Sequence, residues 1–134
     1  MYIVETFPDI TFQYRKDLNV LIVRWMNDST TQAITARYEH ILDLAITYQC
    51  RCWHIDLRRR NAQNRHISDW FVQSYVQRVT AAFPQGIRVG YLLSQIRMSE
   101  TGMSDTQLHY NHLLHAHALQ AFDTEEPLIK WLQA

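Results

Sequence analysis

The sequence predicts an α/β fold with a mixed, mostly parallel five-stranded sheet, about four flanking helices and an N-terminal β-hairpin. Short β-rich runs alternate with longer segments whose apolar residues recur at helical spacing, which is typical of a parallel sheet with helices on its faces. The first two β-rich runs are separated only by a short turn. The 134 residues include three glycines and three prolines, which leaves little room for linkers and indicates a single domain over residues 1–134.

The hairpin is predicted from Ile10–Arg15 and Asn19–Met26. Asp17 and Asn19, where the two runs join, are residues that favour turns. Residues 19–25 read NVLIVRW, and such a nearly continuous apolar run is typical of a strand covered on both faces.

A first helix is predicted from about Thr30, because Ser29 and Gln32 form a capping box. Its apolar residues make one buried stripe: Ile34, Tyr38, Ile41, Leu42, Ala45 and Ile46. The third strand, Cys52–Leu57, is the predicted centre of the sheet. Ligands of α/β folds usually bind just beyond the carboxyl ends of such strands.

A second helix is predicted to open at Ser68, which serves as its N-cap, with Asp69 favourably placed in the helix dipole. Residues 84–86, Pro-Gln-Gly, end it, because glycine suits a left-handed cap and proline halts a helix. The fourth strand is Ile87–Leu93, and Gly90 marks a place where a neighbour packs closely.

The remaining elements are a helix, a strand and a helix. Ser104 and Gln107 form a second capping box, for a helix that runs to about His115. Ala118–Phe122 is the last strand, and Thr124 is the predicted cap of the final helix. Three residues of that helix are expected to face inward: Leu128, Trp131 and Leu132.

The composition narrows the function classes. Thirteen basic residues balance thirteen acidic ones, which argues against nucleic-acid binding. No apolar run approaches the ~20 residues needed to span a bilayer, and the first ten residues do not resemble a signal peptide. Cys50 and Cys52 are too close along one strand to pair well, so two reduced thiols in a cytoplasmic protein are expected.

The order of elements resembles that of the small bacterial STAS-like domains, whose founding members are the anti-sigma-factor antagonists. Within that superfamily the chain is most similar to an uncharacterised branch described as sharing the fold of CRAL-TRIO lipid-binding domains. The residues that carry the resemblance are Leu21–Trp25, Trp53–Arg58, Ser68–Trp70, Ala121, Phe122, Glu125, Glu126, Trp131 and Leu132. The resemblance implies a regulatory module in cytoplasmic signalling.

Ser68 stands about where regulatory STAS domains carry a phosphorylated serine, in an Asp-x-Ser-Ser/Thr-Gly context. Residues 66–70 here read His-Ile-Ser-Asp-Trp, without the following Ser or Thr and Gly. A plain N-cap is therefore favoured over a modification site. A phosphate on Ser68 would gain from the helix N-terminus and from Arg65 but would meet Asp69.

Four arginines fall within eight positions of the loop after the third strand: Arg58, Arg59, Arg60 and Arg65. They fit an anion- or partner-binding loop beside a helix N-terminus. The alternative is a solvated loop whose arginines pair with surface acids. Trp70 lies off the apolar face of the second helix, so it is a candidate for an exposed partner surface.

The histidines do not form a convincing catalytic or metal site. His109, His112, His115 and His117 lack a carboxylate partner, and the first three do not share one helical face, so helix-surface histidines are expected. His54 and Asp56 lie on one face of the third strand, but no nucleophile motif accompanies them. A buried, hydrogen-bonded His54 is expected, with Asp56 accepting backbone N–H groups of the next loop.

We expect a non-enzymatic module without cofactor or metal, which binds a protein partner or itself through Arg58 to Arg65 and Ser68 to Val72. Self-association would use an exposed edge of the N-terminal hairpin, as a homodimer. The alternative is a small-ligand or lipid-binding domain, whose apolar pocket of several hundred Å³ would place the arginines on an anionic head group. A hydrolase using His54 or the later histidines is the least favoured.

Overall fold

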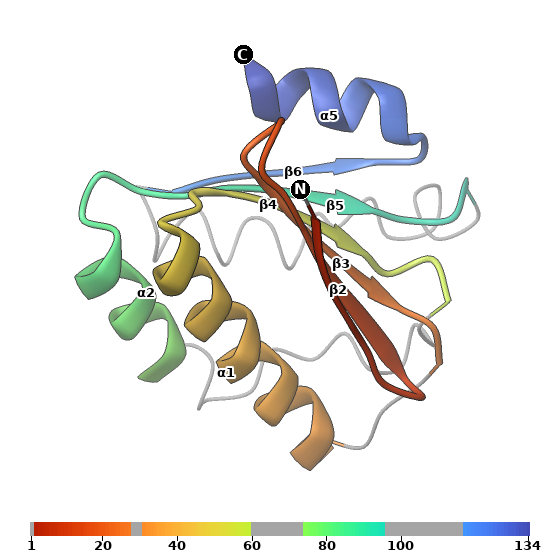
Figure 1. The fold of residues 1–134 in the computed structure, drawn as a ribbon. Helices are drawn as coiled ribbons and strands as arrows, with labels where there is room; N and C mark the ends of the chain where they lie inside the picture. Colours follow the sequence, from red (N-terminus) through yellow and green to blue (C-terminus); the bar gives the residue numbers. More distant parts are fainter. Residues whose placement is uncertain (1, 28–30, 60–73, 96–116) are drawn as a thin grey trace.

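The structure, a computed structural model, describes residues 2–27, 31–59, 74–95 and 117–134. Six strands form one sheet in sequence order (Figure 1). They are β1 (Tyr2–Thr6), β2 (Ile10–Arg15), β3 (Val20–Trp25), β4 (Cys52–Asp56), β5 (Arg88–Leu92) and β6 (Ala118–Phe122). The helices of the described residues are α1 (Thr31–Tyr48), α2 (Val76–Ala82) and α5 (Glu125–Gln133).

The predicted α/β class is confirmed, but the strand and helix counts differ. The sheet has six strands instead of five, because β1 adds to the expected hairpin through a tight turn in which Phe7 N donates to Ile10 O at 2.9 Å. The described residues contain three helices instead of four. The helix expected at 104–115, the opening of the second helix at Ser68 and the capping residue Ser29 lie outside the described residues.

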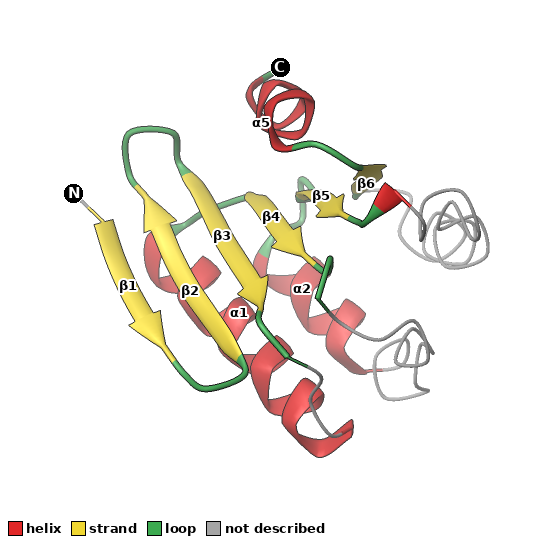
Figure 2. Cartoon of the chain, turned by 90° about the vertical axis from the view of Figure 1, so that its right-hand side faces the viewer, coloured by secondary structure: helices red, strands yellow, loops and turns green. Residues whose placement is uncertain are grey.

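The sheet is mixed, as predicted. β1, β2 and β3 pair antiparallel, whereas β3 to β6 all run parallel. Two parallel strands that follow one another in the chain must be joined by a crossover connection. When successive right-handed crossovers all step in the same direction across the sheet, their helices lie on the same face of the sheet. Figure 2 shows this result, with α1 and α2 together on one face and α5 alone on the other.

The face under α1 and α2 holds the larger core. Alternate residues of the central strands point there and are buried: Leu21, Val23, Trp25, Trp53, Ile55, Val89 and Tyr91. The predicted stripe of α1 meets them through Tyr38, Ile41, Leu42 and Ala45. Ile46 is the exception, since its side chain is 48% exposed at the edge of the stripe, next to the chain's exit toward β4.

The opposite face is narrower and is covered by α5. Leu128 and Leu132 pack there on Val20, Ile22 and Leu92. Trp131, which was also expected to face inward, is only half-buried and lies beneath the Arg88 guanidinium, 4.3 Å from its ring centroid. This small second core fixes the position of α5 over the ends of the central strands.

Three local predictions can be compared directly with the backbone. Gly86 has the expected left-handed backbone, with φ 93°, but it does not cap α2. The C-cap is Phe83, and Gly86 closes the turn after it by donating its N–H to Phe83 O at 2.9 Å. Asn19 has φ 52° at the turn between β2 and β3, also as its residue type favours. Thr124 takes the N-cap position of α5, but the predicted side-chain cap is wrong. The third helical position is Pro127, which has no N–H for the hydroxyl to bind.

Candidate functional site

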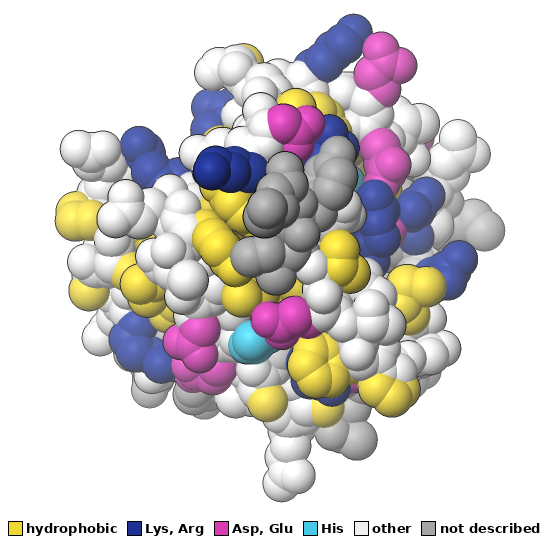
Figure 3. Space-filling model, in the orientation of Figure 1, with side chains coloured by type: hydrophobic (Ala, Val, Ile, Leu, Met, Phe, Trp, Pro, Cys, Tyr) yellow, Lys and Arg dark blue, Asp and Glu magenta, His cyan; other side chains and the backbone are white. Residues whose placement is uncertain are grey.

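The most distinctive group of side chains lies where β3 and β4 end and α5 begins. We define the polar cluster as Arg24, His54, Asp56, Arg58 and Glu125. Arg24 and Asp56 are direct neighbours across the parallel strands, and His54 lies two residues before Asp56 on the same face. Figure 3 shows basic and acidic side chains next to each other where the parallel strands end, below the start of α5. This is the edge at which α/β sheets usually bind ligands.

Asp56 is the centre of the polar cluster. Its Oδ1 accepts hydrogen bonds from the backbone N and the Nε of Arg58, both at 3.0 Å. Its Oδ2 accepts from Arg58 Nη2 at 2.8 Å and from Arg24 Nη1 at 3.0 Å. Burial raises the pKa of this carboxyl, but the Arg58 and Arg24 bonds outweigh it and leave the pKa below its ordinary value. Asp56 is therefore a fixed carboxylate that holds both arginines.

Arg24 links the end of β3 to the C-terminal helix. Its Nη1 binds both Asp56 and Glu125, and the second contact joins residues 101 positions apart in the chain. Burial raises the pKa of Glu125, but the hydrogen bond and charge of Arg24 leave the pKa below its ordinary value. The first turn of α5 is thus attached to the sheet by a charged contact as well as by Leu128.

His54 is the most enclosed member of the polar cluster, with 1% of its surface exposed. Its Nε2 lies 3.3 Å from Glu125 Oε1, yet neither ring nitrogen makes a well-directed hydrogen bond with the described residues. Burial and the nearby charge of Arg24 lower the His54 pKa, against the smaller effects of Glu125 and Asp56. The imidazole is therefore neutral at pH 7.

The structure places only part of the predicted arginine loop. Arg58 and Arg59 follow β4 directly and are exposed. Arg58 is held on Asp56, as described above, while Arg59 Nη1 lies 3.9 Å from Met26 Sδ. The other predicted binding residues lie outside the described residues: Arg60, Arg65, Ser68 and Trp70.

The two predictions for β4 differ in outcome. Asp56 accepts the backbone N–H of the next loop, as expected. His54 is buried as expected, but the expected hydrogen bond is not formed with described residues. Arg24 and Glu125 were not identified as site residues. Arg24 could have been, because a lone charge in NVLIVRW needs a partner when both faces are covered.

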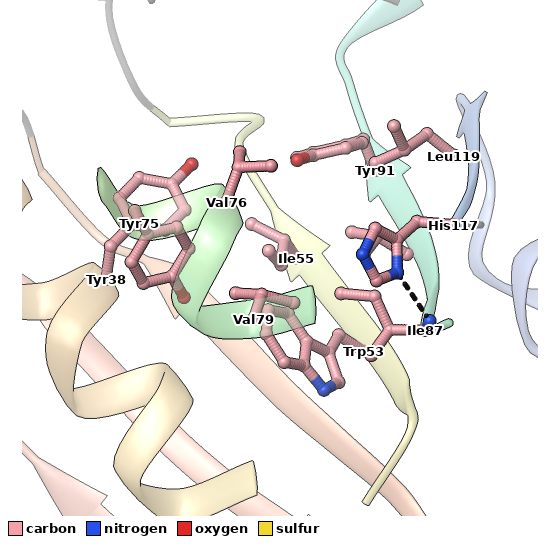
Figure 4. Close-up of a pocket in the computed structure, with 11 residues that line it drawn as sticks. Tyr38, Trp53, Ile55, Tyr75, Val76, Val79, Ile87, Tyr91, His117 and Leu119 are labelled. Carbon is pink, nitrogen blue, oxygen red and sulfur yellow. Dashed lines mark hydrogen bonds between the residues drawn. The ribbon is translucent and has the colours of Figure 1, made fainter. Parts of the chain in front are cut away.

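The described residues also line one apolar cavity between the sheet and the two crossover helices (Figure 4). Its volume is about 30 Å³, which is room for at most about two water molecules. The lining includes three tyrosines, Tyr38, Tyr75 and Tyr91, with His117 beside them. An apolar pocket of several hundred Å³ is not formed by the described residues.

The expectation of a helix-surface histidine is wrong for His117. It is buried just before β6, and its Nδ1 accepts the backbone N–H of Ile87 at 2.9 Å (Figure 4). The proton must then be on Nε2, which donates to Thr80 Oγ1 at 3.0 Å, and that hydroxyl donates to Val76 O. His117 therefore joins α2 to the starts of β5 and β6. His109, His112 and His115 lie outside the described residues.

Both cysteines are free thiols. Burial raises the pKa of Cys50 to about 11 and also raises that of Cys52. A thiol that stays protonated at neutral pH is a poor nucleophile. Within the described ranges, no three His, Cys, Asp or Glu side chains are grouped to hold a metal ion, and no helix is long and apolar enough to cross a membrane.

No family model, no curated protein and no solved structure matches this chain. The resemblance to STAS-like domains therefore stays a prediction from the sequence, and the function must be argued from the chain's own residues.

Proposed function

We propose that the chain is a non-enzymatic regulatory module of STAS-like type, which binds an acidic segment of a protein partner at the end of β4. One observation carries this proposal. Asp56 fixes the Arg58 backbone and guanidinium through three bonds of 2.8 to 3.0 Å, at the edge of the sheet where ligands bind. The loop thus leaves the sheet with a positioned arginine, followed by exposed Arg59.

The positioned guanidinium suits a carboxylate-rich partner. Arg58 uses Nε and Nη2 on Asp56, and its Nη1 makes no bond to the described residues. Arginine donors in a fixed plane bind carboxylates with geometric specificity. Because the side chain is already ordered, less conformational entropy is lost when the partner binds.

The side chains that could carry catalysis support a binding role instead. Asp56 is saturated by arginine donors, so it is not available as a general base. His54 is enclosed, and the two thiols have raised pKa values. The free thiols also agree with the cytoplasmic location that forms part of this proposal.

The order of strands supports the STAS-like part of the proposal. β3 to β6 follow one another in sequence and run parallel, with crossover helices on one face and the last helix on the other. This agrees with the alternating order from which the resemblance was drawn. The ligand- or lipid-binding alternative is less well supported, because pockets for such molecules measure roughly 300–1,000 Å³, whereas the apolar cavity lined by the described residues measures about 30 Å³.

The test is an NMR titration of the ¹⁵N-labelled protein with a poly-glutamate peptide. We expect the largest shifts at Arg58 and Arg59, and weaker binding as salt is added. Arg59→Glu should weaken the affinity about tenfold, because it replaces an attractive charge with a repulsive one. Lys16→Glu is the matched control, since Lys16 is exposed in the turn at the opposite end of β3. Equal weakening by both variants, or shifts centred elsewhere, would contradict the proposal.

A further inference from the structure

The outer edge of β1 lies at the rim of the sheet and presents backbone groups that no other described strand pairs (Figure 2). The bond from Phe7 N to Ile10 O fixes which groups these are. In an antiparallel pair, hydrogen-bonded and non-hydrogen-bonded positions alternate. Glu5 and Ile3 therefore bond to β2, and the N–H and C=O groups of Tyr2, Val4 and Thr6 point outward.

β1 has few of the features that usually protect an edge strand. It contains no lysine, arginine, proline or glycine, and its five residues pair with β2 in an unbroken register without a bulge. Its one charge, Glu5, lies 2.6 Å from His40 of α1, on the helix-covered face. Val4 is 58% exposed, and among the side chains whose burial is described Ile46, at 48%, is the other exposed large hydrophobic residue.

We propose that this edge binds a second copy of the chain, with the two β1 strands antiparallel about a two-fold axis at Val4. This axis places Val4 opposite Val4 of the partner subunit, and Tyr2 opposite Thr6 of the partner subunit. All three outward residues of each copy are then paired, with about six hydrogen bonds between the chains. The two six-stranded sheets become one continuous sheet.

Other two-fold registers satisfy fewer groups. An axis at Glu5 would bring two carboxylates directly opposite each other, which is destabilising. An axis at Ile3 would leave Thr6 outside the paired segment. With the axis at Val4, Glu5 meets Ile3 of the partner subunit instead, and the exposed Val4 side chains contact each other. The strand is thus complementary to itself in one register.

The surface is small, so the dimer should dissociate on dilution. Sedimentation velocity from low micromolar to submillimolar concentration should show a mass that rises from 16.0 kDa toward twice that value. A chain that remains monomeric over the whole range would overturn the proposal. The edge is separate from the end of β4, so Val4 variants should leave peptide binding at Arg59 unchanged, and the two proposals can fail independently.

Charge variants at Val4 test the symmetry of the pairing. Val4→Lys and Val4→Glu should each be monomeric, because each places like charges opposite themselves. An equimolar mixture of the two variants should recover the dimer. Ile46→Lys is the matched control, since it changes the other exposed hydrophobic residue and should leave the dimer intact. Dimers of either single Val4 variant, or a mixture that stays monomeric, would contradict pairing at Val4.

A cross-linking experiment tests the register independently. Residues of a hydrogen-bonded antiparallel pair have Cα atoms about 5.5 Å apart, within reach of a disulfide. Val4→Cys should form a covalent dimer under mild oxidation, and Thr6→Cys should not, because the two Thr6 positions lie about 13 Å apart along the strands. The wild-type protein shows the background from Cys50 and Cys52. Equal cross-linking of both variants would overturn the register.

Discussion

Gly90 of β5 packs directly against the Leu128 side chain of α5, so that any side chain at position 90 would collide with Leu128. A Cβ atom added to Gly90 would lie 2.7 Å from Leu128 Cγ and 2.8 Å from Cδ2. Leu128 is fully buried, so its side chain cannot adopt another rotamer without displacing its neighbours. This contact sets how closely α5 approaches the sheet, and therefore whether Glu125 reaches Arg24.

The first prediction is that Gly90→Ala destabilises the protein by about 1–3 kcal/mol, the usual result of overpacking a core. Urea unfolding followed by circular dichroism measures the change. The reason is steric, because β5 would have to move away from α5 to accept the methyl group.

Leu128→Ala provides the control for this explanation. Alone it should cost about 2–5 kcal/mol, because it leaves a cavity. In the Leu128→Ala background, Gly90→Ala should be close to neutral, so the double-mutant cycle should show strong coupling. Additive effects would mean that the collision with Leu128 is not the cause.

The second prediction concerns Asp56, whose carboxylate holds two arginines and a backbone N–H group. Asp56→Asn should lower the free energy of unfolding at pH 7 by about 1–3 kcal/mol, since the Arg24 and Arg58 donors lose a charged partner that is itself buried. The pKa of Asp56 is lowered in the folded state, so its contribution is present above the unfolded pKa of about 3.9 and is lost as the pH falls through the lower folded pKa.

The difference between wild type and Asp56→Asn should therefore shrink when unfolding is repeated at successively lower pH below about 4. Glu126→Gln is a suitable control, because Glu126 is exposed and pairs with the exposed Lys130, so its loss should change stability by less than about 1 kcal/mol. A pH-independent difference would show that Asp56 acts through its shape and not its charge.

Short β-rich and apolar runs, with the turn residues between them, were enough to predict five of the six strands. The strand that was missed, β1, is an edge strand with Val4 exposed to solvent. It is therefore a strand because its backbone pairs with β2, and less because its side chains are buried. Gly90 was predicted correctly as a place of close packing because glycine inside a strand has few other reasons to occur.

The candidate site was predictable only where its contacts are local. An aspartate at the end of a strand commonly accepts a backbone N–H of the loop that follows, so the bond from Arg58 N to Asp56 could be predicted from the local sequence. The ion pair between Arg24 and Glu125 joins residues 101 positions apart, and the local sequence around either residue does not predict the other as its partner. The position of α5 over the sheet depends on Leu128 and Gly90, and it is the fold that brings Glu125 to the site.

The third prediction is that Cys50 does not react in the folded protein. Its pKa is raised to about 11 by burial, so the thiolate is scarce at pH 8. A thiol reagent such as Ellman's should modify Cys52 slowly in native protein and both residues at once in denaturant. A Cys52→Ser variant leaves Cys50 as its one cysteine, and rapid modification of that variant under native conditions would show that Cys50 is more accessible than its full burial indicates.

The last prediction concerns the charge state of His54. The pKa of this residue is lowered by burial and by Arg24, and Glu125 opposes the shift. Proton NMR of the His54 ring should therefore give a midpoint below about 6.5. Glu125→Gln should lower the midpoint further, because it removes a negative charge 3.3 Å from Nε2. Glu126→Gln, one residue away and exposed, should leave it unchanged.

The sign of the linked stability effect follows from the lowered pKa. The folded state binds fewer protons than the unfolded state, so the His54 contribution is fully present above about pH 6.5 and is lost as the pH falls through the folded pKa. His54→Leu should therefore be less sensitive to acid than wild type just below pH 6.5. If instead the two proteins lost stability in parallel, the acid sensitivity would belong to other groups, and the pKa of His54 would be the same in the folded and the unfolded chain.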